Sequence, residues 1–391
     1  MAGWQQVKIG DVCVVERGGS PRPIEKFITE DKDGINWIKI GDTTESMYIT
    51  KTAQKIIPDG AKKSRFVQSG DFLLSNSMSF GRPYILSIDG CIHDGWLVLR
   101  DKDNLFDKHF LYYCLSAPVT YAKFKSMAVG GVVNNLNSEM VRKVEIPLPP
   151  LDEQRRIAAV LDKVSGLIAK RREQLDKLDE LLKARFVEMF GDCKTNPQGW
   201  ETCYLEEIAE VGSSRRVFVE ELKDEGIPFY RGTEVGALAE GMTITPELFI
   251  TEEHYKDLCE MTGKPQKGDL LMPSICPDGR IWLVDTEDPF YFKDGRVLWV
   301  HGISDKFDPV FLLYTLKDRI MTDYSSIASG TTFAELKIFA LKRCQVFNAP
   351  IELQKKFSAF ISNINRSKLT IQKSLDKLEV LKKSLMQQYF G

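Results

Sequence analysis

The stretch that decides the fold is Pro147–Lys163, which reads PLPPLDEQRRIAAVLDK. The pair Pro149–Pro150 ends the preceding segment, because proline has no backbone donor and restricts the residue before it. Asp152 can then cap a helix, and Glu153 stands in the first turn, where a negative charge is favourable. The stretch therefore predicts a rigid proline segment that runs directly into a long helix.

The same arrangement returns two hundred residues later, in a less regular form, at Asn348–Asn363. The tetrapeptide Leu175–Leu178 also recurs intact as Leu375–Leu378. Further pairs keep their order along the chain with small drifts in spacing: Gly3 with Gly199, Gly70 with Gly268, Gly81 with Gly279, Asp94 with Asp294, Gly130 with Gly330, and Gln154 with Gln354. A period of roughly 200 residues is too long for a solenoid and indicates two copies of a whole domain.

Each copy divides into a globular part and a helix. Short β-like runs, such as Gly34–Ile40 and Asp71–Leu74, alternate with turn residues in the globular part. The predicted fold class is α+β, with two tandem mixed α/β domains separated by two long antiparallel coiled-coil helices. The predicted boundaries are 1–150 and 192–350 for the domains, and 151–191 and 351–391 for the helices.

Apolar residues recur in both predicted helices with alternating spacings of four and three, which is the pattern of a coiled-coil seam. A helix packed only on its own globular core would need a wider apolar stripe. Arg171 interrupts the first seam and Lys368 interrupts the second. A helix from Asp152 to Phe190 would be about 58 Å long, so the pair is expected to act as a spacer. The residues expected in the helix–helix seam are Leu161, Val164, Ile168, Leu175, Leu178, Leu182, Ile361, Ile364, Ile371, Leu375, Leu378 and Leu385.

Composition predicts an ordinary soluble chain, with 43% hydrophobic and 28% charged residues. Neither a signal peptide nor a membrane-spanning run is visible, so we expect a cytoplasmic protein. The eight cysteines and four histidines are too scattered to indicate a zinc site or a redox dithiol, and reduced, mostly buried thiols are expected.

Catalytic motifs are absent from the sequence. It contains no phosphate-binding loop, no GxSxG and no Asn/Asp-Pro-Pro-aromatic tetrapeptide of the kind that an adenine methyltransferase would carry. A loose PD…ExK pattern places Asp278 far from Glu335, and the first copy has no carboxylate at the place of Glu335. A stand-alone Mg²⁺ nuclease is therefore a minor alternative, and no catalytic or metal-binding residue is expected.

Duplex DNA suits two similar domains held at a fixed separation. The net charge is only −2, and residues 1–150 carry 19 basic and 17 acidic side chains, so contacts must come from local basic loops. The loop Arg17–Arg22 is expected to offer free amides and two guanidinium groups, and Lys62–Arg65 is a short basic cluster that could equally be a solvated face.

The residues expected to contact DNA lie in polar turns at corresponding places in the two copies. In the first copy they are Arg17, Gly18, Gly19, Ser20, Arg22, Lys62, Lys63, Arg65, Ser75, Asn76, Ser77, Arg82, Gly130, Gly131, Asn134 and Asn135. In the second copy they are Ser213, Ser214, Arg215, Arg216, Tyr230, Arg231, Ser274, Arg280, Ser329, Gly330, Thr331 and Thr332. The side chains differ between the copies while the framework repeats, which predicts two domains that read different sequences.

The chain resembles, over its whole length, a specificity subunit of a type I restriction–modification enzyme. The motif running from Ile146 to Ile157, followed by a long helix ending at Phe190, carries most of the resemblance, and the start Trp4–Asp11 adds to it. The second junction, Phe347–Gln354, departs from the motif, which leaves open whether both ends bind partners equally well.

The resemblance implies two target-recognition domains that read the halves of a split DNA site, with the helices as a ruler. It implies two methyltransferase subunits and translocating restriction subunits as partners. It implies no cofactor on this chain, because S-adenosylmethionine, ATP and Mg²⁺ are expected only in those partner subunits. The alternative hypothesis is a non-catalytic protein–protein scaffold of a related defence complex with incidental DNA binding.

Overall fold

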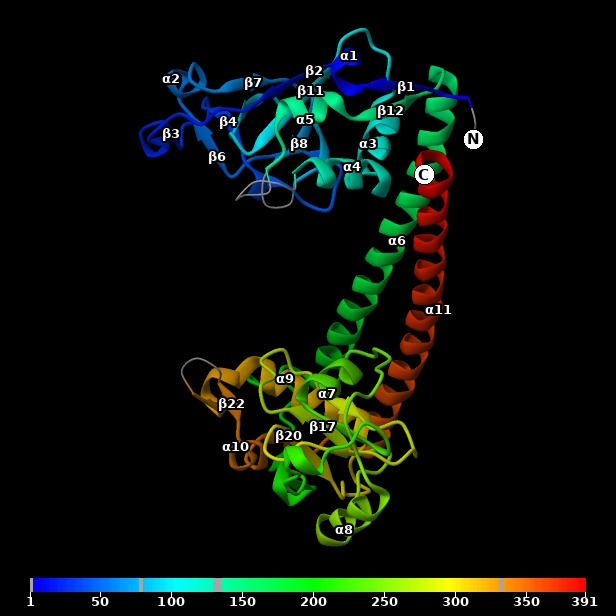
Figure 1. Cartoon of the computed structure of the whole chain (residues 1–391). Coiled ribbons are helices and arrows are strands. Elements are labelled where there is room, and N and C mark those ends of the chain that lie inside the picture. The colour runs from blue at the N-terminus through cyan, green and yellow to red at the C-terminus, as the bar shows by residue number, and fades with distance from the viewer. Residues whose placement is uncertain (1–2, 77–79, 129–134, 331–333) are drawn as a thin grey trace. The chain divides into compact units, whose positions relative to one another are not determined.

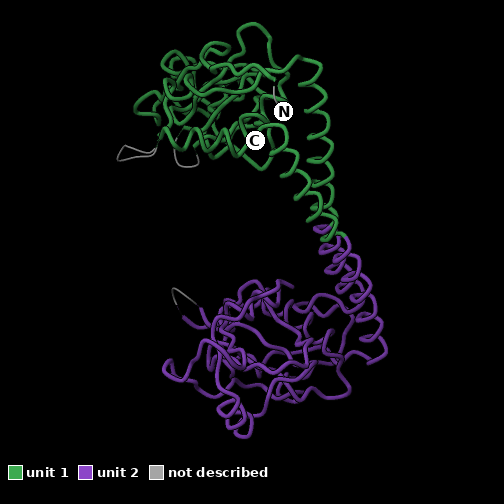
Figure 2. The backbone as a smooth tube through the Cα atoms, turned by 45° about the vertical axis from the view of Figure 1, so that its right-hand side comes forward, with its two compact units in different colours: residues 1–174, 371–391 green, residues 175–370 purple. Residues whose placement is uncertain are grey.

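The computed structural model describes residues 3–76, 80–128, 135–330 and 334–391. The chain divides into two compact units, shown in Figure 2. Unit 1 comprises residues 1–174 and 371–391, and unit 2 comprises residues 175–370. Each unit is larger than the globular domain predicted for it, because each also contains part of both long helices.

Two sheets form most of the globular part of unit 1. The first has the strand order β2 (Cys13–Arg17), β11 (Trp96–Asp101), β8 (Phe72–Ser75), β9 (Pro83–Leu86) and β5 (Tyr48–Ile49). The second has the order β3 (Ile28–Thr29), β6 (Gln54–Ile56), β4 (Ile35–Ile38), β10 (Gly90–Ile92) and β7 (Arg65–Val67). The helices are α1 (Ile9–Val12), α2 (Pro58–Ala61), α3 (Lys108–Ser116), α4 (Pro118–Ala128) and α5 (Ser138–Lys143).

Unit 2 repeats this plan with shorter strands. Its larger sheet has the order β14 (Glu210–Gly212), β20 (Val297–His301), β17 (Leu270–Pro273) and β18 (Trp282–Leu283). Its second sheet has the order β16 (Phe249–Ile250), β15 (Ile227–Tyr230) and β19 (Tyr291–Phe292), and β21 (Ala328–Ser329) pairs with β22 (Glu335–Leu336). The helices are α7 (Gly232–Ala239), α8 (Glu252–Thr262), α9 (Pro309–Ile327) and α10 (Ile338–Lys342). The mixed α/β fold predicted for both copies is therefore confirmed.

A two-stranded sheet closes each unit next to its junction. In unit 1, β1 (Gln5–Lys8) pairs with β12 (Glu145–Leu148), and in unit 2, β13 (Thr202–Tyr204) pairs with β23 (Gln345–Phe347). The last strand of each copy is thus hydrogen-bonded to the first strand of that copy just before the long helix begins. The junction is anchored to the start of its own domain.

The long helices are α6 (Leu151–Phe190) and α11 (Ile351–Phe390), and Figure 1 shows them side by side. In unit 1 the guanidinium of Arg172 on α6 lies 2.9 Å from the carboxylate of Glu379 on α11. In unit 2 the ammonium of Lys368 on α11 lies 2.6 Å from the carboxylate of Asp179 on α6. The start of α6 shares a core with the end of α11 in unit 1, and the end of α6 packs on the start of α11 in unit 2, so the helices are antiparallel within each unit.

All twelve residues predicted for the seam are shielded from solvent to some degree. Those that are buried are Leu161, Val164, Ile168, Leu182, Ile361 and Leu375. Those that are half-buried are Leu175, Leu178, Ile364, Ile371, Leu378 and Leu385. Nearer the globular domains the pattern changes to aromatic packing: in unit 2 the rings of Phe190 and Phe357 lie 5.6 Å apart, and in unit 1 those of Phe110 and Phe390 lie 5.5 Å apart.

A buried glutamine ties each long helix to the globular domain of the same copy. Gln154 is fully buried, and its Nε2 donates to the carbonyls of Leu105 at 2.9 Å and Pro149 at 2.8 Å. Its Oε1 accepts from the backbone N–H of Asp107 at 2.8 Å, and Asp107 caps α3 through the N–H of Phe110. One side chain therefore joins the proline segment, the start of α6 and the start of α3.

Gln354 makes the same three hydrogen bonds in unit 2. It is fully buried, donates to the carbonyls of Lys306 at 3.2 Å and Ala349 at 2.7 Å, and accepts from the N–H of Asp308 at 2.8 Å. Asp308 caps α9 as Asp107 caps α3. The junction geometry thus survives the loss of the PLPPLDEQ motif, because the glutamine keeps its three partners.

We predict that Gln154→Ala destabilises unit 1, and Gln354→Ala unit 2, by about 3–5 kcal/mol each, since every buried partner left unpaired costs roughly 1–3 kcal/mol. Urea unfolding followed by intrinsic fluorescence would measure the loss. Gln174→Ala is the matched control, because Gln174 is exposed on α6 and its side chain, among the described residues, accepts a hydrogen bond from Arg171 on the same helix. Equal stability of the Gln154 and Gln174 variants would contradict the role given to the junction glutamines.

Candidate nucleic-acid interface

Three loops meet at one edge of the larger sheet of unit 1. Strand β11 is antiparallel to both β2 and β8, and the register pairs Leu97 with Arg17 and Trp96 with Ser75. The loop after β2, the loop after β8 and the turn before β11 therefore leave the sheet side by side. Two of them, 17–22 and 75–82, are loops that the sequence predicted to contact DNA. We call this edge the reading edge of unit 1.

Asp94, in the turn before β11, holds these loops together. Its carboxylate accepts a hydrogen bond from the Ser20 hydroxyl at 2.8 Å and lies 3.5 Å from the guanidinium of Arg22. Its backbone carbonyl accepts from Nε of Arg17 at 3.0 Å and from the Asn76 amide at 2.9 Å. The predicted DNA contacts of two separate loops thus converge on one turn.

The Asp94 carboxylate is held in its ionised form. Burial alone would raise the pKa of this group, but the Ser20 hydroxyl and the neighbouring positive side chains lower it below its usual value of 3.8. His93 adds to this, since its Nε2 lies 2.9 Å from Oδ1 of Asp94. The negative charge fixes the direction in which the loop 17–22 presents its arginines.

Some loop groups expected to face DNA are used inside the protein instead. The amides of Gly18 and Gly19 are not free, because they donate to the carbonyls of Trp96 at 2.9 Å and Ile92 at 3.1 Å. A Cβ at Gly18 would lie 2.2 Å from the carbonyl oxygen of His93, so this glycine permits close packing of the loop. The expectation of free amides in this loop was wrong.

The small polar residues of the next loop are also internal. Ser75 and Asn76 are 1% and 3% exposed, and the backbone carbonyl of Asn76 accepts from the N–H of Leu136 at 2.9 Å. Ser274 has the corresponding place in unit 2, is 3% exposed, and accepts from the N–H of Leu336 at 2.7 Å. These buried residues therefore support the loops of the reading edge and do not face solvent.

Unit 2 has an equivalent reading edge. Strand β20 is antiparallel to β14 and β17, which brings the loop 213–216 next to the turn 293–296. The Ser213 hydroxyl accepts from the N–H of Gly295 at 2.9 Å, and Nε of Arg216 lies 3.3 Å from the Asp294 carboxylate. The aspartate–arginine contact is therefore present in both units, although the loops differ in sequence.

Other predicted contacts lie in several environments. Lys62 pairs with Asp59 on the surface, and Arg65 of β7 pairs at 2.8 Å with Glu16 of β2, a strand of the other sheet. Arg231 is held by Glu234 and Glu247 at the start of α7. The half-buried Tyr230 stacks on Phe290, with ring centroids 5.1 Å apart. The predicted residues Ser77, Gly130, Gly131, Asn134, Thr331 and Thr332 lie outside the described residues.

The remaining predicted residues keep solvent-facing groups or stand beside the reading edges. The exposed members are Arg17, Arg22, Lys63, Arg82 and Asn135 in unit 1, and Arg215, Arg216, Ser329 and Gly330 in unit 2. The Lys63 ammonium lies over the ring of Phe27 at 4.8 Å. The half-buried Arg280 pairs with Asp278 at 2.9 Å. Exposed arginines are thus the main positive groups that both edges offer to a ligand.

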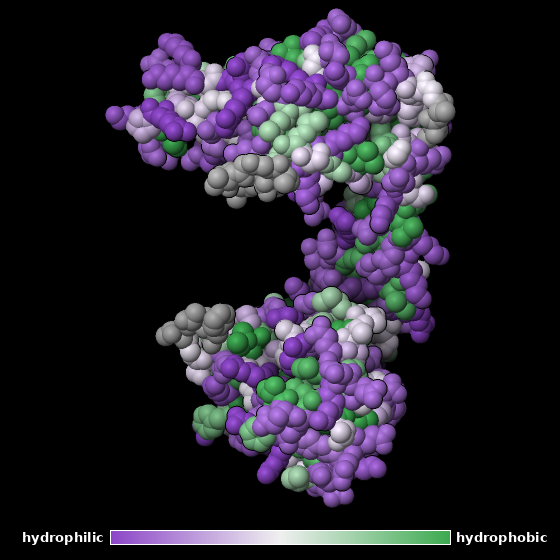
Figure 3. Space-filling model, viewed as in Figure 1, coloured by the Kyte–Doolittle hydropathy of each residue, from purple (hydrophilic) through white to green (hydrophobic). Residues whose placement is uncertain are grey.

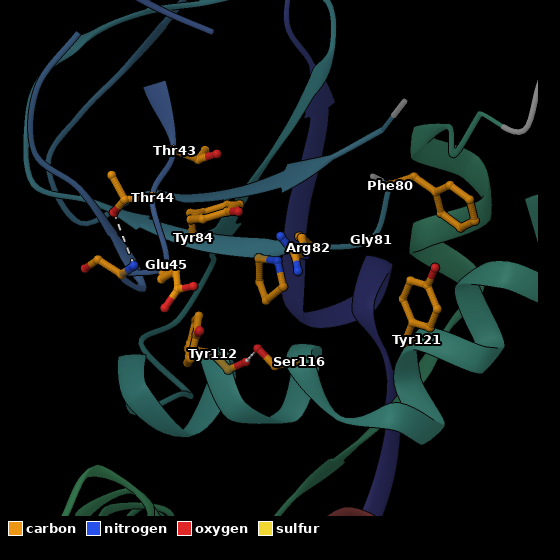
Figure 4. A pocket seen from close by; sticks show the side chains of 12 residues that line it. Thr43, Thr44, Glu45, Phe80, Gly81, Arg82, Tyr84, Tyr112, Ser116 and Tyr121 are labelled. Atoms are coloured by element: carbon orange, nitrogen blue, oxygen red, sulfur yellow. Dashed lines mark hydrogen bonds between the residues drawn. The ribbon is translucent and has the colours of Figure 1, made fainter. Parts of the chain in front are cut away.

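Arg82 lies in a hollow of about 850 Å³ in unit 1 (Figure 4). Tyr112 and Ser116 of α3, Tyr121 of α4, and Tyr84 line this hollow around it. No ion pair of the Arg82 side chain occurs among the described residues, and Glu45, which also lines the hollow, pairs with Arg172. Among the residues that line the hollow, this guanidinium is therefore available to a phosphate or to the edge of a base.

The residues of the nuclease alternative do not form a metal site. The Glu335 carboxylate is bonded to Arg296 and to Lys337, which lies 2.6 Å away, and Asp278 pairs with Arg280. Across the described ranges, no group of three or more His, Cys, Asp or Glu residues could hold a metal ion. All eight cysteines are free and six are buried, and burial raises the pKa of the Cys344 thiol to about 11.

The surface of both units is mainly hydrophilic on the face that Figure 3 shows. Hydrophobic residues lie there in small groups. No helix among the described residues is long and apolar enough to span a bilayer.

Sequence reasoning missed Asp94, Asp294 and His93 as parts of the reading edges. The signal was available, because Asp94–Gly95 and Asp294–Gly295 are one of the repeated pairs. An acidic residue was not considered for a DNA-binding loop, yet here it positions the arginines.

Both copies of the repeat match the same family of known proteins. A family model for the type I restriction modification DNA specificity domain matches residues 1–179 and 197–382. The MjaIX and MjaVIII type I restriction enzyme specificity subunits of Methanocaldococcus jannaschii are 25% and 22% identical to this chain, each over 98% of it and 91% of the relative. The crystal structure of a type I restriction–modification system S subunit from M. genitalium shares the fold, with a TM-score of 0.59 and 17% identity over 100% of this chain and 96% of that one.

We predict that Asp94→Asn destabilises unit 1 at neutral pH, because it removes the charge that holds Ser20 and Arg22. The pKa of Asp94 is lowered in the folded protein, so its stabilising contribution is complete above the unfolded value of 3.8 and is lost as pH falls through the lowered value. Urea unfolding of both proteins between about pH 3 and about pH 7 should show the difference in stability narrowing at the acidic end. The matched control is Asp33→Asn, an exposed residue, and a difference that is the same at every pH would contradict the prediction.

Proposed function

The chain belongs to the family of type I restriction modification DNA specificity domains and carries two of them, and we propose that each domain reads one half of a split site in duplex DNA. The chain is a specificity subunit, whose role is DNA sequence recognition, and the scaffold alternative is not favoured. The observation that carries the split-site proposal is the pair of reading edges, which share a framework and differ in their exposed side chains.

The reading edges suit base recognition because their arginines are oriented before DNA arrives. Arg17 is held by a carbonyl and Arg216 by a carboxylate, so neither has to be ordered from a free rotamer ensemble on binding. Arginine donates bidentately to the O6 and N7 atoms of guanine in the major groove. We therefore assign Arg17, Arg22 and Arg82 to one half-site, and Arg215 and Arg216 to the other.

The long helices are proposed to set the number of base pairs between the half-sites. Each helix has 40 residues and contributes to both units. Forty residues of α-helix span about 60 Å, which corresponds to roughly 17 base pairs or fewer once part of each helix packs against a domain. The buried glutamines support this role, because they fix the start of each helix to a domain.

The chain itself has a recognition role and no assigned catalytic residues. We propose that two methyltransferase subunits, which bind S-adenosylmethionine and modify adenine at N6, and restriction subunits that use ATP and Mg²⁺, supply the chemistry. The chain is expected to act in the cytoplasm, where the host DNA is. Its formal net charge of −2 predicts weak DNA binding alone and tighter binding with the methyltransferase subunit.

The test of the split site is methylome sequencing of a methylation-free host that expresses this chain with its cognate methyltransferase subunit. We expect methyl-adenine at one split motif with a fixed gap. A short undivided motif would mean that only one domain reads DNA. No methylation, from a complex that can be purified intact, would contradict the proposed function.

Loop exchange tests the assignment of the half-sites. Replacing residues 17–22 and 75–82 with those of another family member should change the half-site read by unit 1 and leave the gap and the other half unchanged. The matched control replaces residues 213–216 and 274–280, which should change only the other half. A change in both halves after either exchange would show that the units do not read independently.

A further inference from the structure

Three lysines from three different helices gather in unit 2. They are Lys183 on α6, Lys317 on α9 and Lys368 on α11. Lys368 stands where the heptad pattern calls for an apolar residue, and it is half-buried. Its ammonium reaches the carboxylate of Asp179, one turn before Lys183, at 2.6 Å. Three ammonium groups thus share the neighbourhood of one carboxylate on the helices.

Lys317 shows that this charge is not balanced. Burial lowers the pKa of its ammonium, and the positive charges of Lys183 and Lys368 lower it further, against the opposing effect of Asp179 and Asp278. Asp278 is itself paired with Arg280 at 2.9 Å. Lys368 is paired with Asp179, whereas the ion pairs of the described residues include neither Lys183 nor Lys317, so these two ammonium groups keep an unpaired positive charge.

The cluster adjoins a loop predicted to contact DNA. Gly279 has a φ of +65°, and a Cβ at this position would lie 2.9 Å from Cγ of Lys317 and 3.1 Å from Cγ of Met321. The turn Gly279–Arg280 therefore rests directly on the face of α9 that carries Lys317. The three lysines extend the polar surface of this turn onto the long helices.

Unit 1 has a different surface at the corresponding place. Ser116 and Lys317 both lie nine residues after the aspartate that caps their helix, Asp107 in α3 and Asp308 in α9. In unit 1 the shorter serine side chain lines the hollow around Arg82 (Figure 4). The lysine cluster is therefore a feature of unit 2 and is not required by the shared fold.

We propose that Lys183, Lys317 and Lys368 bind backbone phosphates of the duplex beside the half-site read by unit 2, an inference that rests on the proposed function. Phosphate diesters are the ligand class that the cluster suits, since lysines contact phosphates as point charges without reading sequence. A bound phosphate would also relieve the mutual repulsion that Lys317 meets from its two lysine neighbours. The contacts fix the register of the duplex on this unit and carry no base specificity.

The experiment measures the salt dependence of DNA binding by the full chain with its methyltransferase subunit. The probes are two duplexes of equal length, one with the split site found by methylome sequencing and one with that site scrambled. The variant combines Lys183→Gln with Lys317→Met, which keeps the alkyl packing of Lys317 against Gly279. The slope of log K against log salt concentration should become less steep by about 0.9 for each lysine lost. The affinity should fall by the same factor for both duplexes.

The matched control is Lys256→Gln, an exposed lysine on α8, which lies on the opposite side of unit 2 from α9 in Figure 1. It removes one positive charge and should leave the slope unchanged. Lys317→Arg keeps the charge and should keep the wild-type slope, which separates loss of charge from loss of packing.

An unchanged slope in the double variant, or a loss confined to the cognate duplex, would overturn the phosphate assignment. Failure of the proposed function has a different signature, because methylome sequencing would then give no split motif and the wild-type complex would bind unrelated duplexes of equal length equally well. The slopes can still be compared in that case, so the two failures are distinguishable.

Discussion

The hydrogen bonds of one buried amide in each copy, Gln154 and Gln354, are the constraint on which the rest of the structure depends. Each amide makes three bonds that join the end of the globular domain, the start of a long helix and the cap of the helix α3 or α9. In a buried site these groups have no water to replace the missing partner, so the geometry of the junction is fixed. A helix attached in this way transmits the orientation of its domain. The second copy lacks most of the proline motif and has the glutamine with the same three bonds, so the junction geometry depends on the amide more than on the sequence around it.

Each reading edge contains residues that repeat in both copies and residues that differ between them. The buried serines and the Asp–Gly turns repeat, while the exposed arginines differ between copies. An ion pair with Asp94 or Asp294 weakens the attraction of an arginine for phosphate, because the carboxylate partly neutralises the positive charge of the guanidinium. The same ion pair fixes the direction of the guanidinium. Recognition therefore depends on the match between guanidinium and base edge more than on attraction between opposite charges. The lysine cluster of unit 2 complements this, because the ion pairs of the described residues leave out Lys183 and Lys317, and lysine contacts to phosphate carry no sequence information.

Much of the fold could be predicted from the sequence because its signals are local or periodic. The spacing of apolar residues predicted both helices, and the repeat predicted two copies of one domain. Whether a loop residue is buried or exposed could not be predicted, since it depends on strand register. Ser75 and Asn76 look like surface hydrogen-bonders, yet the pairing of β8 with β11 buries them. Arg231 looks free in sequence, although Glu234 and Glu247 hold it in the fold. Lys368 could be recognised only as an interruption of the seam, and its partner Asp179 comes from the other helix.

The central claim, that two fixed junctions turn the helices into a spacer between two readers, is tested most directly by shortening both helices together. Deleting residues 171–177 and 371–377 removes one heptad from each helix and keeps the seam in phase. The helices become about 10 Å shorter, which corresponds to about three base pairs. Methylome sequencing of the shortened chain should show the same two half-sites with a gap smaller by about that number. Altered half-sites with an unchanged gap would contradict the claim.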